Sequence, residues 1–176
     1  MSEPQPHGQV RVVIVDDDAL VRAGLAMILR GDPAITIVGE AGDGEAGVAL
    51  VSETSPDVVL MDIRMPRLDG LGATARLMTQ PSPPKVIVLT TFDADDYVVR
   101  ALRDGASGFL LKDTPPAQIV EAIHKVAAGD HMLSPSVTAQ LIARLSESDS
   151  DSSKHTRAES LVEALSPRER EVAIAV

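Results

Sequence analysis

Short aliphatic runs alternate with longer amphipathic segments along most of this chain, and the alternation leaves few folds open to it. Three of the runs are apolar throughout, which is typical of strands covered on both faces in a parallel sheet. The sequence therefore predicts five β-α units that form a parallel sheet with right-handed crossovers and helices on both faces. The predicted strands are residues 10–15, 35–41, 57–62, 85–90 and 108–112.

The segments between these runs have helical spacing and local start or stop signals. The proline-containing stretches DPA (32–34) and QPSPPK (80–85) break the helical pattern, and Gly105 and Gly129 are placed as helix C-terminal glycines. The predicted helices are residues 19–30, 44–53, 70–79, 94–104 and 115–128.

The pattern changes after Gly129. Residues 134–145 predict one more helix, with Ser134 as its N-cap. Residues 146–160 are polar and rich in serine, which is typical of a flexible linker. We therefore divide the chain by sequence into four parts. These are a disordered N-terminus (1–9), a main domain (10–129), a linker with one helix (130–164) and the first helix of another domain (165–176).

Charge and composition exclude several kinds of protein. A formal net charge of -10 argues against a broad basic face for nucleic acid. The absence of cysteine excludes disulfides and Cys-ligated metal sites. The apolar runs are far shorter than the roughly 20 residues that cross a bilayer, and the N-terminus lacks a signal pattern. We therefore expect a cytoplasmic protein without a membrane partner.

Polar residues gather where the predicted strands end. Asp16 and Asp17 follow the first strand, Asp62 ends the third, Thr90 ends the fourth and Lys112 ends the fifth. The carboxyl ends of parallel strands meet at one edge of the sheet, so these side chains should converge there. Clustered carboxylates with only oxygen ligands favour a hard cation, and Mg²⁺ is the natural choice. A metal-bound phosphate beside a carboxylate in turn suggests attack by that carboxylate on phosphorus.

Four motifs in order resemble the receiver domain of bacterial two-component response regulators over residues 10–129. The motifs are VVIVDDDALVR, DVVLMDIRMPRLDG, VIVLTTF and GASGFLLKD. The tail LSPREREV resembles the opening of a LuxR-type helix-turn-helix, so the whole resembles a NarL/LuxR-type response regulator cut short. The resemblance implies a flavodoxin-like (βα)5 doubly wound parallel sheet with strand order 2-1-3-4-5.

The resemblance also implies a role for each site residue. Asp62 would be the phosphoacceptor, and Asp16 and Asp17 the acidic pair that organises Mg²⁺, with Mn²⁺ as a substitute. Asp18, just before a helix, is better explained as its cap. Further implied roles are the backbone carbonyl of Arg64 as a metal ligand, Thr90 and Phe109 as switch residues, Lys112 as the phosphate partner, and Pro66 and Gly70 as shapers of the neighbouring loop.

Two readings of function compete. In the first, a sensor histidine kinase phosphorylates Asp62, and the protein is a switch rather than an enzyme, with dimerisation and transcription as outputs. In the second, Asp16 and Asp18 form the D-x-D of a haloacid-dehalogenase-like, Mg²⁺-dependent phosphatase, which leaves Asp62 unexplained. DNA binding needs the second helix of a helix-turn-helix. We therefore expect it only of a longer chain.

Overall fold

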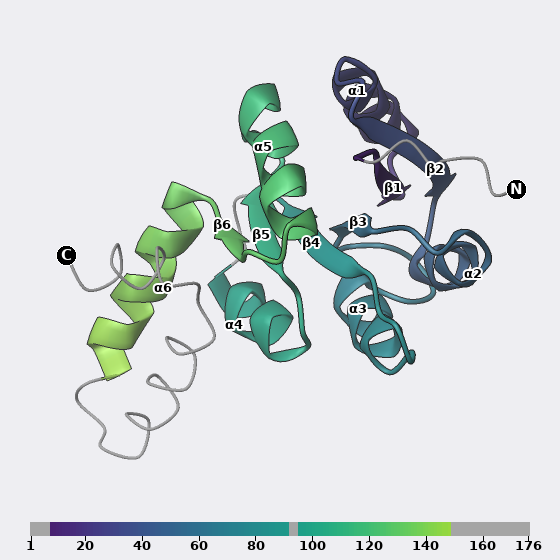
Figure 1. Ribbon diagram of the computed structural model, residues 1–176. Coiled ribbons are helices and arrows are strands. Elements are labelled where there is room, and N and C mark those ends of the chain that lie inside the picture. Colours follow the sequence, from purple (N-terminus) through teal and green to yellow (C-terminus); the bar gives the residue numbers. More distant parts are fainter. Residues whose placement is uncertain (1–7, 92–94, 149–176) are drawn as a thin grey trace, which may run out of the picture.

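The computed structural model describes residues 8–91 and 95–148 and contains a six-stranded, all-parallel sheet (Figure 1). The strand order is β2-β1-β3-β4-β5-β6. The strands are β1 (Val10–Val15), β2 (Ile35–Ala41), β3 (Val58–Asp62), β4 (Lys85–Thr90), β5 (Gly108–Leu111) and β6 (Met132–Leu133). The helices are α1 (Ala19–Arg30), α2 (Gly44–Thr54), α3 (Gly70–Met78), α4 (Asp95–Arg103), α5 (Pro116–Ala127) and α6 (Pro135–Ser148).

Both faces of the sheet are covered, so the central strands are buried on both sides. Helices α1 and α5 cover one face, where Ile14 of β1 packs in one core. Helices α2, α3, α4 and α6 cover the other face, where Val13 and Val15 pack in a second core. The alternation of side chains along each strand divides the aliphatic residues between these two cores. This arrangement confirms the predicted doubly wound sheet.

The predicted helices and strands begin and end within one or two residues of the observed positions, apart from the last helix, and several local signals act as expected. Asp18 caps α1 by accepting hydrogen bonds from the backbone N–H groups of Leu20 and Val21, at 2.8 and 3.3 Å. Gly105 and Gly129 adopt positive φ angles of 101° and 99° after α4 and α5. None of the described helices has the length and apolar character needed to cross a membrane.

The sheet has one strand more than the sequence indicated. In β6, Met132 and Leu133 pair with Gly108 and Phe109 of β5, which extends the predicted order 2-1-3-4-5 by a sixth member. A two-residue strand shows no periodic pattern, so sequence reasoning had no signal for it. The backbone N–H of Ser134 continues this pairing by donating to the carbonyl of Phe109, at 3.1 Å.

Helix α6 packs onto the sheet beside α4 (Figure 1). Val137 and Leu141 of α6 are buried in the same core as Val98 of α4. Ser134 caps the helix as predicted, accepting a hydrogen bond from the N–H of Val137 at 3.3 Å. The helix runs through Ser148, three residues beyond its predicted end, so it includes the start of the predicted flexible stretch. The rest of that stretch and the predicted helix 165–176 lie outside the described residues.

Candidate functional site

Three aspartates gather at the carboxyl edge of the sheet, where the sequence placed them. Asp16 follows β1 and Asp62 ends the neighbouring β3, whose Met61 lies opposite Val15. Carboxylate oxygens of Asp16, Asp17 and Asp62 all lie within 4.8 Å of one another. Asp16 and Asp62 are only 1% and 5% exposed, whereas Asp17 is exposed to solvent. Two carboxylates of the cluster are therefore buried, and the third is accessible to solvent.

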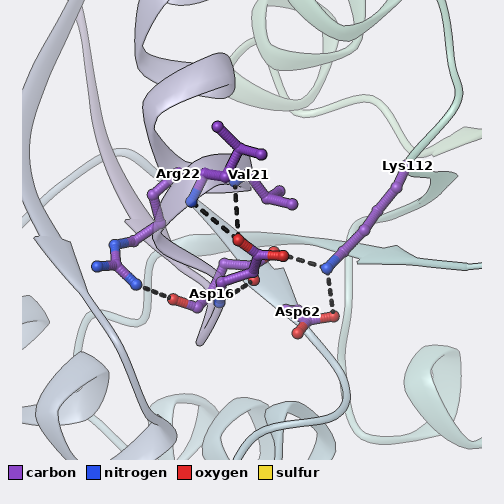
Figure 2. A network of polar contacts seen from close by, with 7 residues as sticks. Asp16, Val21, Arg22, Asp62 and Lys112 are labelled. Atoms are coloured by element: carbon purple, nitrogen blue, oxygen red, sulfur yellow. Dashed lines mark hydrogen bonds and ion pairs between the residues drawn. The ribbon is translucent and has the colours of Figure 1, made fainter.

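Lys112 connects two of these aspartates. Its Nζ lies 2.7 Å from Oδ2 of Asp16 and 3.2 Å from Oδ1 of Asp62 (Figure 2). Burial alone would lower the pKa of Lys112, but hydrogen bonds and electrostatic attraction from the two carboxylates outweigh it and raise this pKa above its ordinary value. Lys112 is therefore a permanent cation at the site.

Asp62 holds its proton more tightly than an ordinary aspartate. Burial and the neighbouring charge of Asp16 raise its pKa to about 6, although Lys112 pulls the pKa in the opposite direction. At neutral pH the side chain is still mostly ionised. Asp62 is therefore a buried carboxylate that is available as a nucleophile and is held at a cost in stability.

Thr90 and Phe109, the two predicted switch residues, lie in different surroundings. Thr90 ends β4, next to β3, and is 5% exposed. Its backbone carbonyl accepts a hydrogen bond from the N–H of Lys112 at 2.7 Å, which keeps the ends of β4 and β5 together. Phe109 is fully buried in the core that it shares with α4 and α6. The structure thus brings Thr90 to the edge of the site and places Phe109 beneath the helices.

The loop after Asp62 carries the other predicted residues. Arg64 is exposed in this loop, and the carbonyl of Pro66 accepts a hydrogen bond from the N–H of Leu68 at 2.9 Å. Gly70 begins α3 and donates its N–H to the carbonyl of Ile63 at 2.8 Å. A Cβ atom on Gly70 would collide with the backbone carbonyl of Asp62. Only glycine lets α3 start this close to the strand that carries Asp62.

Gly70→Ala should therefore destabilise the protein by at least about 2 kcal/mol, because the added methyl group meets main-chain atoms that cannot rotate away. Chemical denaturation measures the effect. Gly24→Ala in α1 is the matched control, since a Cβ there has no neighbour within 4 Å. That variant should gain about 0.5 to 1 kcal/mol from helix propensity. Equal stability of the two variants would contradict the close approach at Gly70.

A second cation, Arg22, lies at the site and was missed by the sequence reasoning. Its Nη1 donates to the backbone carbonyl of Asp16 at 2.5 Å, and its guanidinium approaches the acidic residues from the side opposite to Lys112 (Figure 2). One signal was present in the sequence, namely an arginine one helical turn after Asp18 in a segment that has no other charged residue before Arg30.

The fold and the site together define a class of protein, a doubly wound α/β domain with an acidic, lysine-bridged cluster at the carboxyl edge of its sheet. The family model described as the response regulator receiver domain matches residues 12–124. The chain therefore belongs to the response regulator receiver family, and its relatives are of the NarL/LuxR type.

Curated relatives are similar over almost the whole chain. The transcriptional regulatory protein LiaR of Bacillus subtilis is 40% identical over 163 residues, which cover 93% of this chain and 74% of LiaR. The nitrate/nitrite response regulator protein NarL of Escherichia coli is 33% identical over 172 residues, which cover 98% of this chain and 76% of NarL.

Two solved structures agree with this assignment. The receiver domain of NarL from Mycobacterium tuberculosis is 39% identical, with a TM-score of 0.67, and the match covers 69% of this chain and 98% of that one. A LuxR-family response regulator from Aurantimonas has a TM-score of 0.72 at 30% identity, with 76% of this chain and 95% of that one covered. The predicted family is thereby confirmed.

Proposed function

We propose that this protein is a phosphorylation-controlled switch that accepts a phosphoryl group on Asp62 from a sensor histidine kinase. The observation that carries the proposal is the position of Asp62, a buried carboxylate at a strand end, with Lys112 Nζ at 3.2 Å and two further aspartates beside it. The family membership supports the same role.

The acidic cluster suits a divalent cation. All of its donors are carboxylate oxygens, which Mg²⁺ prefers. Oδ2 of Asp16 is buried, and Nζ of Lys112, at 2.7 Å, is its one partner among the described residues. Asp16, Asp17, Asp62 and the backbone carbonyl of Arg64 would hold the ion, with Mn²⁺ as a substitute. A bound Mg²⁺ neutralises charge on the phosphoryl oxygens.

The residues of the chain then divide the work. An oxygen of the Asp62 carboxylate attacks the phosphorus of a phosphohistidine, so that an O–P bond forms while the P–N bond breaks and the imidazole leaves with a proton from solvent. Lys112 offsets negative charge on the transferred group, and the Thr90 hydroxyl donates a hydrogen bond to it. Catalysis is limited to the protein's own phosphorylation and dephosphorylation.

The outputs of the switch follow from the same proposal. Rearrangement of Thr90 and Phe109 towards the new charge would alter the surface around α4, β5 and α6 and promote a homodimer. In a longer chain with a complete LuxR-type helix-turn-helix, this dimer would control binding to DNA and hence transcription. The relative LiaR is named as a transcriptional regulatory protein, and NarL as a nitrate/nitrite response regulator protein.

Incubation of the protein with acetyl phosphate and Mg²⁺ tests the proposal. Intact-mass measurement should show one added phosphoryl group, and borohydride trapping followed by peptide mapping should place it on Asp62. Chelation of Mg²⁺ with EDTA should abolish the addition. Absence of the adduct with Mg²⁺ present, or its location on another residue, would overturn the proposal.

The local structure around Asp18 argues against the phosphatase alternative, which rests on the D-x-D of Asp16 and Asp18. Asp18, the second aspartate of the D-x-D, is occupied as the cap of α1, with its Oδ1 accepting from the N–H groups of Leu20 and Val21. A phosphatase would need this carboxylate beside Asp16 in the acidic cluster, which Asp18 does not join. Multiple turnover on small phosphate esters would restore the alternative, and we expect none.

A further inference from the structure

Arg22 of α1 connects three elements behind the acidic cluster. Its Nη1 donates to the backbone carbonyl of Asp16 at 2.5 Å, and its Nε lies 3.8 Å from Oε2 of Glu40 near the end of β2. The Arg22 side chain is only 22% exposed, so the guanidinium is largely enclosed. The main chain after β1 is also anchored by the N–H of Asp16, which donates to the carbonyl of Ala41 at 3.0 Å.

The carbonyl that Arg22 binds belongs to the peptide unit between Asp16 and Asp17. The two aspartates depend on this unit to different degrees. The Asp16 carboxylate has anchors of its own, because Oδ1 accepts from the N–H of Asp18 at 2.9 Å and Oδ2 pairs with Lys112 at 2.7 Å. No hydrogen bond or ion pair to the Asp17 side chain occurs within residues 8–91 and 95–148.

The range of directions open to the Asp17 carboxylate is therefore limited by its main chain and not by contacts of the side chain. A peptide unit is planar, so a hydrogen bond that holds its carbonyl also holds the position of the next Cα atom. Fixing this peptide unit restricts where the Asp17 carboxylate can point before any ion binds. Ligands that are held in place in advance bind more tightly, because less conformational freedom is lost on binding.

We propose that Arg22 is a positioning residue that holds the Asp16–Asp17 peptide so that Asp17 faces the divalent cation. This inference rests on the proposed function, because it concerns the same Mg²⁺. In this role Arg22 strengthens Mg²⁺ binding, although its positive charge by itself would weaken it. A guanidinium near a divalent cation repels it, so a purely electrostatic role predicts tighter Mg²⁺ binding when Arg22 is neutralised. A positioning role predicts weaker binding.

Isothermal titration calorimetry of the whole chain with Mg²⁺ distinguishes the positioning role of Arg22 from a purely electrostatic one. Arg22→Gln should weaken the Mg²⁺ affinity about tenfold, as is typical when a residue that orients a metal ligand is lost. Arg11→Gln is the matched control, because Arg11 also donates to a backbone carbonyl, that of Ser55 at 3.0 Å, but at the opposite end of β1. The control should bind Mg²⁺ like the wild type. Unchanged or tighter binding by Arg22→Gln overturns the inference.

Two additional measurements cover the case in which Arg22→Gln does not fold and separate failure of this inference from failure of the proposed function. Denaturation without Mg²⁺ shows whether Arg22→Gln is folded. If it is not, Arg22→Lys, which keeps the charge but loses the planar fork, should bind Mg²⁺ more weakly than the wild type, and equal or tighter binding overturns the inference. The wild type is titrated and phosphorylated in parallel. A wild type that binds no Mg²⁺ contradicts the proposed function, whereas a normal wild type with an unaltered Arg22→Gln contradicts the role of Arg22 alone.

Discussion

Asp62→Asn should abolish phosphoryl uptake and, at the same time, stabilise the Mg²⁺-free protein at neutral pH. The amide has no carboxylate oxygen with which to attack phosphorus, so no acyl phosphate forms. The gain in stability follows from the raised pKa of Asp62, about 6 in the folded protein and about 4 in an unfolded chain. Two pKa units correspond to about 3 kcal/mol, which is the upper limit of the expected gain.

The pH dependence distinguishes this explanation from a general effect of the substitution. Between pH about 4 and about 6 the folded protein keeps a proton that the unfolded chain has released, so the contribution of Asp62 to stability falls as the pH rises. Urea denaturation in EDTA should therefore show the largest gain for Asp62→Asn above about pH 6 and almost none near pH 4.

Asp57→Asn provides the control for this experiment. Asp57 is an exposed aspartate just before β3, at the opposite end of that strand, and it accepts a hydrogen bond from the N–H of Arg11 at 2.8 Å. The control should gain no stability above pH 6 and should still be phosphorylated. A stability difference between Asp62→Asn and the wild type that does not change with pH would contradict burial of the Asp62 charge.

Lys112→Met should destabilise the Mg²⁺-free protein by about 2 to 4 kcal/mol, because it leaves the Asp16 and Asp62 carboxylates without their shared cation. The value lies below that of a fully buried pair, since the Lys112 side chain is 20% exposed. Mg²⁺ in excess should restore part of the loss, because it supplies positive charge to the same oxygens. Thermal denaturation with Mg²⁺ and with EDTA measures both effects.

Lys125→Met is the matched control for this loss. Lys125 also forms an ion pair, at 2.6 Å to Glu121, but between neighbouring turns of α5 and away from the acidic cluster. Such pairs on a helix surface contribute less than about 1 kcal/mol, and Mg²⁺ should not change the result. An equal loss in the two lysine variants would show that the Lys112 bridge carries no special stability.

Most of the fold was predictable because its signals are local. Strands buried on both faces are continuously apolar, and their helices carry caps such as Asp18 and terminal glycines such as Gly105. The acidic cluster was predictable for a topological reason, since residues that follow parallel strands must meet at one edge. The convergence of Asp16, Asp17, Asp62 and Lys112 could therefore be expected from the sequence alone.

The features that escaped prediction depend on tertiary contacts. β6 is too short for a pattern and forms because its two residues meet the open edge of β5. The full burial of Phe109 depends on α6 as well as α4, so it could not be read from the motif around Phe109. The position of Arg22 after the acidic triplet was visible in the sequence, but its hydrogen-bond partner is a main-chain atom, which no side-chain pattern reveals.

Because α6 packs on α4, any partner for that side of α4 must compete with α6. A partner that binds α4 on this side must displace a helix belonging to the same chain, joined to β5 through α5 and β6. Because α6 belongs to the same chain, its competition with a partner is intramolecular and does not depend on protein concentration. A partner with low affinity for α4 therefore does not displace α6. Weaker packing of α6 on α4 would lower the affinity that a partner needs in order to bind.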